Sequence, residues 1–347
     1  MPANIISTKG NLLEADVEAL VNTVNTVGVM GKGIALQFRQ TFPENFVAYK
    51  AACKYGSLEP GAMFVTETHL LTNPHYIINF PTKRDWRAKS KIEDIDAGLA
   101  ALVSTVRELG IRSIAVPPLG CGNGGLEWDE VRPKIEAAFA NLPEVHVLLY
   151  GPEGAPAADK IKIATKRPKM TPTRAAFVGM LDGYMIPGYN ITILEIQKLA
   201  YFLQAAGEPM KLPFVKAQRG PYAETIHPVL QRLEGHFLRG YGDRSRDISL
   251  HVLPDAVRES NLFLEDHPET RTRIARVFEL VDGFETEYSL ELLATVHWLA
   301  WNEDEKIRRD PAAAVRGVQA WSERKAGLFP AEHIEIAWKR LQEQQWI

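Results

Sequence analysis

The chain has 347 residues, of which 46% are hydrophobic and 24% are charged. This composition excludes a wholly disordered protein, and the length favours two domains, because one domain usually takes roughly 100 to 200 residues. Forty Lys and Arg residues stand against 43 Asp and Glu residues, so the net charge is −3. A general basic coat for nucleic acid is therefore excluded, and any contact with nucleic acid has to be local.

Cysteines and long apolar stretches are scarce. Cys53 and Cys121 are too few for a disulfide framework or a four-ligand zinc cluster, so we expect no metal and a reducing compartment. No signal-peptide pattern and no run of about 18 apolar residues occurs. We therefore expect a soluble, cytoplasmic chain without a membrane partner.

Short apolar stretches alternate with longer amphipathic ones in the first 150 residues. Strands are expected at 19–22, 62–66, 76–80, 113–117 and 145–150. Helices are expected at 31–38, 45–55, 91–109 and 128–141. Such alternation predicts an α/β domain, which we place at residues 1–155.

A basic, Pro- and Lys-rich stretch follows at residues 156–174 and is typical of a linker. Beyond it, residues 175–347 carry 20 basic and 25 acidic residues, a net charge of −5. Their periodicity is mainly helical, with helices expected at 193–204, 224–238, 271–281 and 290–302. The sequence thus predicts a second, mostly helical domain.

Two glycine-rich turns follow expected strands: the first glycine loop, residues 28–33, and the second glycine loop, residues 120–125. The first is not a P-loop, because Gly33 follows Lys32 where a Ser or Thr has to reach magnesium. The second has GxGxxG spacing, but Pro117 and Pro118 interrupt the turn that a dinucleotide site needs. Glycines still let backbone amides approach phosphate closely. We therefore expect a crevice that binds two phosphates, although either loop alone could simply close a turn.

Four motifs in this order carry a family resemblance: residues 9–13 (KGNLL), 19–25 (ALVNTVN), 28–33 (GVMGKG) and 120–122 (GCG). Together they resemble a macrodomain, the ADP-ribose-binding three-layer α/β/α module. Residues 30–35, 81–84 and 125–128 are similar to the branch of terminal ADP-ribose glycohydrolases, and above all to bacterial DNA ADP-ribosyl glycohydrolase antitoxins. Residues 196–202 and 219–222 resemble the helical Panacea domain, which accompanies toxins.

The resemblance implies that Lys83 and Asn22 are catalytic. Lys83 follows the strand expected at 76–80, and an unprotonated amine can open the ribose into a Schiff base. The neighbouring cations Arg84 and Arg87 could lower its pKa. On residue type alone, a loop lysine is more often solvated surface.

Binding residues for ADP-ribose are implied in the same way. They are Asn11, Leu12, Asn25, Gly31, Lys32, Gly33, Ile34, Gly120, Cys121, Gly122, Asn123, Gly124 and Tyr150. Alternatives stay open, since Asn22 and Asn25 suit turns as well as the ribose or the base. Tyr150 is expected to stack on adenine or to lie in the core.

Two positions depart from the family pattern. Asn11 stands where many macrodomains have an Asp for the adenine amino group, and an amide oxygen can still accept that hydrogen bond. Gly124 stands where relatives that act on protein carboxylates have a loop acid. Acid–base work then falls to Lys83, to water or to Glu127, which could instead cap the helix expected at Trp128.

The implied function is an antitoxin that reverses DNA ADP-ribosylation, a form of DNA repair. Its macrodomain would hydrolyse the N-glycosyl bond between ADP-ribose and a base of DNA, thymidine in our interpretation, without a metal or cofactor. The helical domain would bind the cognate DNA ADP-ribosyltransferase toxin, and its acidic residues could imitate DNA phosphates or form an ordinary solvated face. The alternatives are a non-catalytic reader of ADP-ribose and a glycohydrolase for modified protein carboxylates.

Overall fold

The computed structural model describes residues 4–153, 162–185, 191–241 and 250–347. The chain forms two compact units, Met1–Lys166 and Arg167–Ile347, and each has its own hydrophobic core. The boundary between them falls inside the stretch expected to be a linker. Part of that stretch lies outside the described residues, and its last three residues already form helix, because Thr171 caps α5 (Pro172–Tyr184) by accepting from the Arg174 amide.

The first unit is built on a six-stranded sheet with the order β1-β6-β5-β2-β4-β3. All neighbouring pairs are parallel except β3 and β4. The strands are β1 (Asn4–Thr8), β2 (Ala19–Asn25), β3 (Phe64–Glu67), β4 (Tyr76–Lys83), β5 (Ser113–Val116) and β6 (His146–Tyr150). The carboxyl ends of five strands therefore meet at one edge of the sheet.

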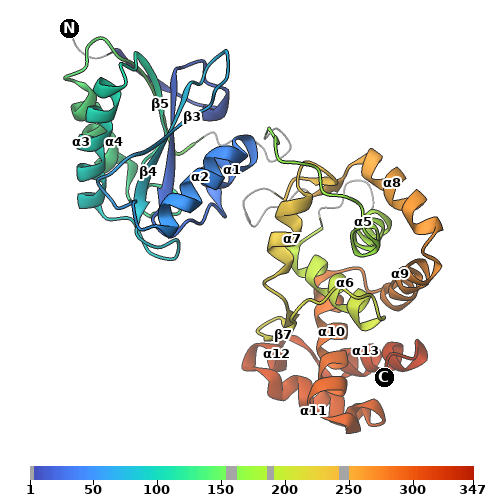
Figure 1. Ribbon diagram of the computed structural model, residues 1–347. Coiled ribbons are helices and arrows are strands. Elements are labelled where there is room, and N and C mark those ends of the chain that lie inside the picture. The colour runs from blue at the N-terminus through green and yellow to red at the C-terminus, as the bar shows by residue number, and fades with distance from the viewer. Residues whose placement is uncertain (1–3, 154–161, 186–190, 242–249) are drawn as a thin grey trace. The chain divides into compact units, whose positions relative to one another are not determined.

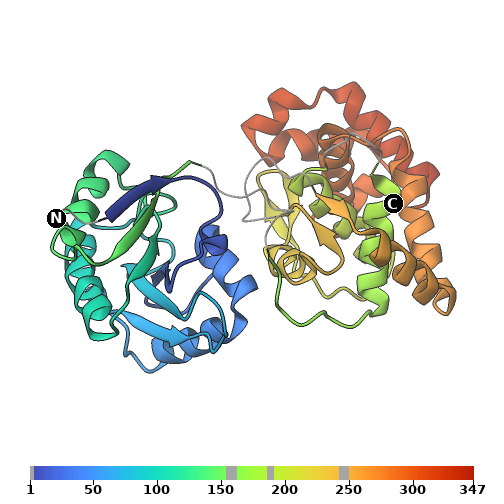
Figure 2. The ribbon, with the colours of Figure 1, turned by 90° about the horizontal axis from the view of Figure 1, so that it is seen from above.

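Helices cover both faces of this sheet (Figures 1 and 2). Helices α1 (Gly33–Thr41) and α2 (Pro43–Lys54) lie on one face, and α3 (Ile92–Glu108) and α4 (Trp128–Phe139) lie on the other. Apolar side chains of the strands alternate between the two faces, so each helical layer closes a separate part of the core. The expected three-layer α/β/α fold is confirmed.

Two strands differ from expectation. Strand β1 was not expected, because residues 4–8 are mostly exposed and show no apolar run. Strand β2 continues to Asn25 instead of ending at Asn22, since its polar residues lie in the sheet interior. The remaining expected strands and helices of this unit are present, with ends shifted by a few residues.

The second unit is mainly helical, as expected. Besides α5 it contains α6 (Ile193–Ala205), α7 (Ile226–Leu233), α8 (Pro254–Glu265), α9 (Pro268–Val281), α10 (Glu287–Asn302), α11 (Pro311–Trp321), α12 (Glu323–Leu328) and α13 (Ala331–Glu343). Two short antiparallel pairs, β7 (Val215–Ala217) with β8 (Gly220–Tyr222) and β9 (Leu238–Arg239) with β10 (His251–Val252), join these helices. In the described parts of the chain, no helix is both long and apolar enough to span a bilayer.

The helix expected at 224–238 is shorter than predicted. Helix α7 ends at Leu233, and the next residues turn back through Gly235, whose φ of 75° favours glycine. The buried Glu234 carboxylate holds this turn by accepting from the amides of Gly240 and Tyr241. The hydrogen bonds of Glu234 thus stabilise the turn that ends α7, whereas the apolar periodicity alone predicts a longer helix.

Candidate functional site

The predicted site residues gather at the carboxyl edge of the sheet, in the loops after β1, β6, β5, β2 and β4. Along this edge, Asn11 follows the outermost parallel strand and Tyr150 ends its neighbour β6. The second glycine loop follows β5, the first glycine loop follows β2, and Lys83 ends β4. The strand order therefore places the residues expected at adenine, at the phosphates and at the distal ribose in one line.

Lys83, the predicted catalytic lysine, ends β4. It stands opposite Asn25 in the β2–β4 register, and its amine donates a hydrogen bond to the carbonyl oxygen of Asn123 in the second glycine loop. Partial burial lowers the pKa of Lys83, which favours the neutral, nucleophilic amine.

Neighbouring cations do not cause this shift, contrary to expectation. The Arg84 guanidinium forms a two-pronged ion pair with Asp94, at 2.7 and 2.9 Å, and Arg87 lies 4.5 Å from the centre of the Trp86 ring. Desolvation alone lowers the pKa of Lys83.

The two glycine loops are neighbours. A Cβ atom at Gly33, where φ is 55°, would lie 3.1 Å from the side-chain nitrogen (Nδ2) of Asn123. Helix α1 begins at Gly33 behind Lys32, which provides no side-chain cap. Within the described residues, the backbone amides of Gly122, Asn123 and Gly124 donate to no protein acceptor. An uncapped helix start beside open glycine-loop amides suits an anion such as a phosphate group.

Gly124 has a steric reason to lack a side chain. A Cβ atom there would overlap the carbonyl oxygen of Gly120 and the hydroxyl of Ser90. The Ser90 amide also donates to the Gly124 carbonyl at 3.0 Å, which fixes the loop against the segment after Lys83. An acidic side chain therefore cannot stand at this position without rearrangement of the loop.

Asn25 holds the first glycine loop. Its side-chain oxygen accepts from the amides of Val27 and Val29 at 3.1 and 3.2 Å, and its amide group donates to the Val29 carbonyl at 2.5 Å. The Tyr49 hydroxyl donates to the Asn25 carbonyl at 2.6 Å. The side-chain amide of Asn25 is thus already used to hold the loop. Its predicted contact with the ribose stays a prediction.

Asn22 lies deeper than expected. It is fully buried inside β2, and its amide group donates to the Asn79 side-chain oxygen at 2.9 Å. Asn79 in turn bonds to Asn45 at 2.7 Å, and Thr66 donates to Asn45 at 2.8 Å. Asn22 thus lies within a strand, as the expected range 19–22 has it, and its catalytic role stays a prediction. Sequence reasoning missed Asn79 and Asn45, although a polar residue inside the apolar stretch 76–80 was a usable signal.

At the other end of the line, Asn11 caps a short 3-10 helix, Leu12–Glu14. Its oxygen accepts from the Leu13 amide at 3.1 Å, and its amide donates to Glu14 at 2.9 Å. Leu12 and Tyr150 are buried together in the core on the α1 side of the sheet. For Tyr150 this geometry favours the core alternative, and the adenine contacts stay predictions.

Residues 21–135 match the model of the Macro domain family. Over the whole chain, the DNA ADP-ribosyl glycohydrolase of Thermus aquaticus is 49% identical across 329 residues, which cover 95% of this chain and 90% of that protein. The chain belongs to the DNA ADP-ribosyl glycohydrolase family. It is therefore a hydrolase, and of the alternatives, a non-catalytic reader is excluded.

Two further comparisons each cover less than half of this glycohydrolase. The solved macrodomain of Mycobacterium tuberculosis DarG is 56% identical, with a TM-score of 0.43, and the match covers 44% of this chain and 99% of that one. A fusion of DNA ADP-ribosyl transferase and DNA ADP-ribosyl glycohydrolase from Thermosipho africanus is 37% identical over 164 residues, which cover 43% of this chain and 42% of that protein.

Two further residues named for the candidate site are Glu127 and Cys121. Glu127 precedes α4 but makes no side-chain cap, so the capping alternative does not hold and the carboxylate stays exposed. Burial, with a contribution from Glu127, raises the pKa of Cys121 to about 11, which leaves the thiol protonated and unreactive. Over the described ranges, no three His, Cys, Asp or Glu side chains gather as a metal site would require.

Proposed function

We propose that this glycohydrolase is an antitoxin that removes ADP-ribose from thymidine in DNA through Lys83. The observation that carries the proposal is the placement of a half-buried lysine amine between the end of β4 and the second glycine loop. An amine there can reach the anomeric carbon of a ribose whose diphosphate lies on the two loops. No metal or cofactor enters the reaction.

In the proposed reaction, the neutral Lys83 nitrogen bonds to the anomeric carbon while the bond from that carbon to the base breaks. The base leaves with one proton of the amine. The bond between the anomeric carbon and the ring oxygen then breaks, the ring oxygen takes the second proton of the amine, and the opened ribose remains as a Schiff base. Water then adds to the Schiff base, which releases ADP-ribose and restores the amine. Because Gly124 cannot carry an acid, proton transfer falls to Lys83, to water or to the exposed Glu127.

The ligand lies along the carboxyl edge in this proposal. The diphosphate meets the first and second glycine loops, the distal ribose lies near Asn25 and Lys83, and adenine lies toward Asn11 and Tyr150. Asn22 acts indirectly, through the amide chain that it forms with Asn79.

A hydrolysis assay tests this part directly. Oligonucleotides that carry ADP-ribose on thymidine or on another base, and a peptide with an ADP-ribosylated glutamate, are offered in parallel. Release of ADP-ribose from the thymidine substrate alone is expected. Cleavage of the glutamate ester at a comparable rate would favour the remaining alternative, a glycohydrolase for protein carboxylates.

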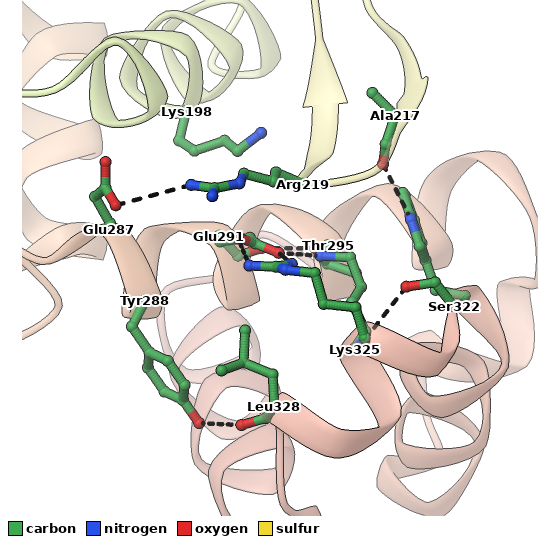
Figure 3. A network of polar contacts seen from close by, with 12 residues as sticks. Lys198, Ala217, Arg219, Glu287, Tyr288, Glu291, Thr295, Ser322, Lys325 and Leu328 are labelled. Atoms are coloured by element: carbon green, nitrogen blue, oxygen red, sulfur yellow. Dashed lines mark hydrogen bonds and ion pairs between the residues drawn. The ribbon is translucent and has the colours of Figure 1, made fainter. Parts of the chain in front are cut away.

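The second unit binds the cognate DNA ADP-ribosyltransferase in this proposal. In support, a groove of about 720 Å³ opens between the start of α6 and the β7–β8 hairpin. Lys198, Arg219 and Glu287 contribute to its wall (Figure 3). A cavity of this size suits a few anchoring side chains of a partner.

A buried ion network supports the groove from below. Glu291 accepts from Arg324 at 2.7 and 3.1 Å and from Lys325 at 2.6 Å, and Thr295 accepts from Lys325 at 3.0 Å (Figure 3). Lys198 donates to the Pro221 carbonyl at 2.6 Å and thereby fixes the hairpin. Such a network gives the groove wall a defined shape.

A pull-down with purified transferase tests the second unit. The fragment 167–347 and the whole chain with Lys83→Ala are both expected to retain the transferase, whereas the fragment 1–166 is not. Retention by 1–166 alone would overturn the assignment of toxin binding to the second unit.

A further inference from the structure

The segment that follows the proposed catalytic lysine is strongly basic. Residues 83–91 contain five Lys or Arg residues and one acid, Asp85, in a chain whose net charge is −3. Its middle also carries an exposed aromatic, Trp86, with 46% of its surface accessible. Trp86 joins none of the hydrophobic clusters that the described residues form. Folding of the unit therefore gives no reason for a tryptophan at this position.

The segment has a fixed shape. At its start, Arg84 is paired with Asp94, and the Thr26 hydroxyl donates to the Arg84 carbonyl at 2.8 Å. In the middle, the Arg87 amide donates to the Asp85 carboxylate at 2.8 Å. At its end, the Ser90 amide donates to Gly124. The segment thus contacts the second glycine loop at its end and Thr26, two residues before the first glycine loop, at its start, and Trp86 lies only three residues from Lys83 along the chain.

Trp86 and its neighbours have the chemistry of a single-strand binding surface. The Arg87 guanidinium stacks on the indole at 4.5 Å, and Lys89 and Lys91 are exposed next in the chain. Proteins that bind single-stranded nucleic acid combine an aromatic platform for a base with cations for the backbone phosphates. A protein partner would match the exposed indole but would give less reason for four cations at residues 84–91.

We propose that residues 84–91 bind the single-stranded DNA next to the modified nucleotide, with a neighbouring base stacked on Trp86 and phosphates near Arg87 and Lys89. This inference rests on the DNA substrate of the proposed function and adds the surface that holds the strand. The overall negative charge is no obstacle, because the contact is local.

The test compares two substrates that differ only in flanking DNA. The first is a short single-stranded oligonucleotide with one ADP-ribosylated thymidine, and the second is ADP-ribosylated thymidine alone. Trp86→Ala is expected to lower kcat/KM on the oligonucleotide by about 10-fold and to leave the nucleoside substrate unchanged. Trp86→Phe, which keeps a ring for stacking, should lose about threefold or less. Arg87→Glu with Lys89→Glu should lower oligonucleotide turnover and flatten its dependence on salt.

Tyr55→Ala is the matched control, because Tyr55 is an aromatic of the same unit with 82% of its surface accessible and lies outside the proposed surface. Tyr55→Ala should leave kcat/KM unchanged on both substrates. Equal losses on oligonucleotide and nucleoside in Trp86→Ala would overturn the inference, since the segment would then only support the site. Unchanged turnover of both would also overturn it.

A binding measurement separates this inference from the proposed reaction. Fluorescence anisotropy with an unmodified, labelled single-stranded oligonucleotide needs no hydrolysis. Weaker binding in Trp86→Ala, with normal binding in Tyr55→Ala, would support the surface even if Lys83 proved not to be the nucleophile. Equal binding by the wild-type chain and Trp86→Ala would count against the surface whatever the reaction mechanism.

Discussion

The amine of Lys83 donates a hydrogen bond to the carbonyl oxygen of Asn123, so the end of β4 contacts the second glycine loop directly. This contact joins the proposed nucleophile to the loop whose open amides suit a phosphate. A ligand that binds the loop is thereby brought close to the amine. Productive placement of the reacting atoms is worth several orders of magnitude in rate in enzymes generally.

Replacing the lysine should separate chemistry from binding. Lys83→Ala is expected to lower hydrolysis of ADP-ribosylated DNA by at least about 100-fold, because the nucleophile is lost. Its affinity for free ADP-ribose should stay within about threefold, since the loops supply most contacts. Single-turnover hydrolysis and calorimetry check the two parts. Lys83→Arg, which keeps the charge, should be equally inactive; full turnover by either folded variant would rule out the lysine mechanism.

Two glycines of the same loop should respond differently to alanine. A methyl group at Gly124 would overlap Gly120 and Ser90, whereas one at Gly122 would meet nothing within 4 Å. Gly124→Ala is therefore expected to weaken ADP-ribose binding by about 10-fold or more, and Gly122→Ala to change it by less than about twofold. Calorimetry measures both. Equal effects would mean that the tight backbone contact at Gly124 does not shape the site.

At Gly122, a negatively charged side chain should affect ADP-ribose binding more strongly than a methyl group does. Gly122→Glu is expected to abolish ADP-ribose binding by placing a carboxylate where phosphate meets the loop amides. Gly33→Glu should do the same in the first glycine loop. Unchanged affinity in both glutamate variants would show that the glycines only close turns.

The buried amide chain should matter for stability. Asn79→Ala removes the acceptor of the Asn22 amide and the partner of Asn45, so two buried polar groups lose hydrogen bonds. A loss of about 2 to 4 kcal/mol in the free energy of unfolding is expected. Asn141→Ala, at an exposed turn, is the control and should cost less than about 0.5 kcal/mol. Denaturant unfolding measures both, and a negligible effect of Asn79→Ala would contradict the account.

Lys198 predicts a dependence of stability on pH. Burial lowers the pKa of Lys198 to about 7 in the folded chain, while in the unfolded chain this side chain has the ordinary pKa of lysine. Between pH 7 and pH 9 the unfolded state therefore binds the extra proton, and stability rises with pH by about 1 kcal/mol per unit. Relative to Lys198→Met, the wild-type chain should gain stability over this range. Lys339→Met, which removes an exposed lysine, should leave the slope unchanged.

The sequence predicted the layered fold, and the residues that it named as a candidate site lie along one edge of the sheet, because parallel strands end at the same edge. It did not predict which polar groups face each other. Arg84 could have lowered the pKa of Lys83, but it forms an ion pair with Asp94 of α3 instead. Which partner it has depends on how α3 packs against β4, and the spacing of residues in the sequence does not predict that packing. The same holds for Gly124, whose lack of a side chain follows from Ser90 and Gly120 rather than from the family motif alone.

Chemical trapping of the intermediate tests the central claim most directly. The whole chain is incubated with ADP-ribosylated single-stranded DNA in the presence of cyanoborohydride, which reduces a Schiff base to a stable amine, and its peptides are identified by mass spectrometry. The account predicts ADP-ribose attached to Lys83, with no adduct in Lys83→Ala. Complete hydrolysis of the DNA without an adduct on Lys83, or an adduct on another lysine that persists in Lys83→Ala, would contradict it.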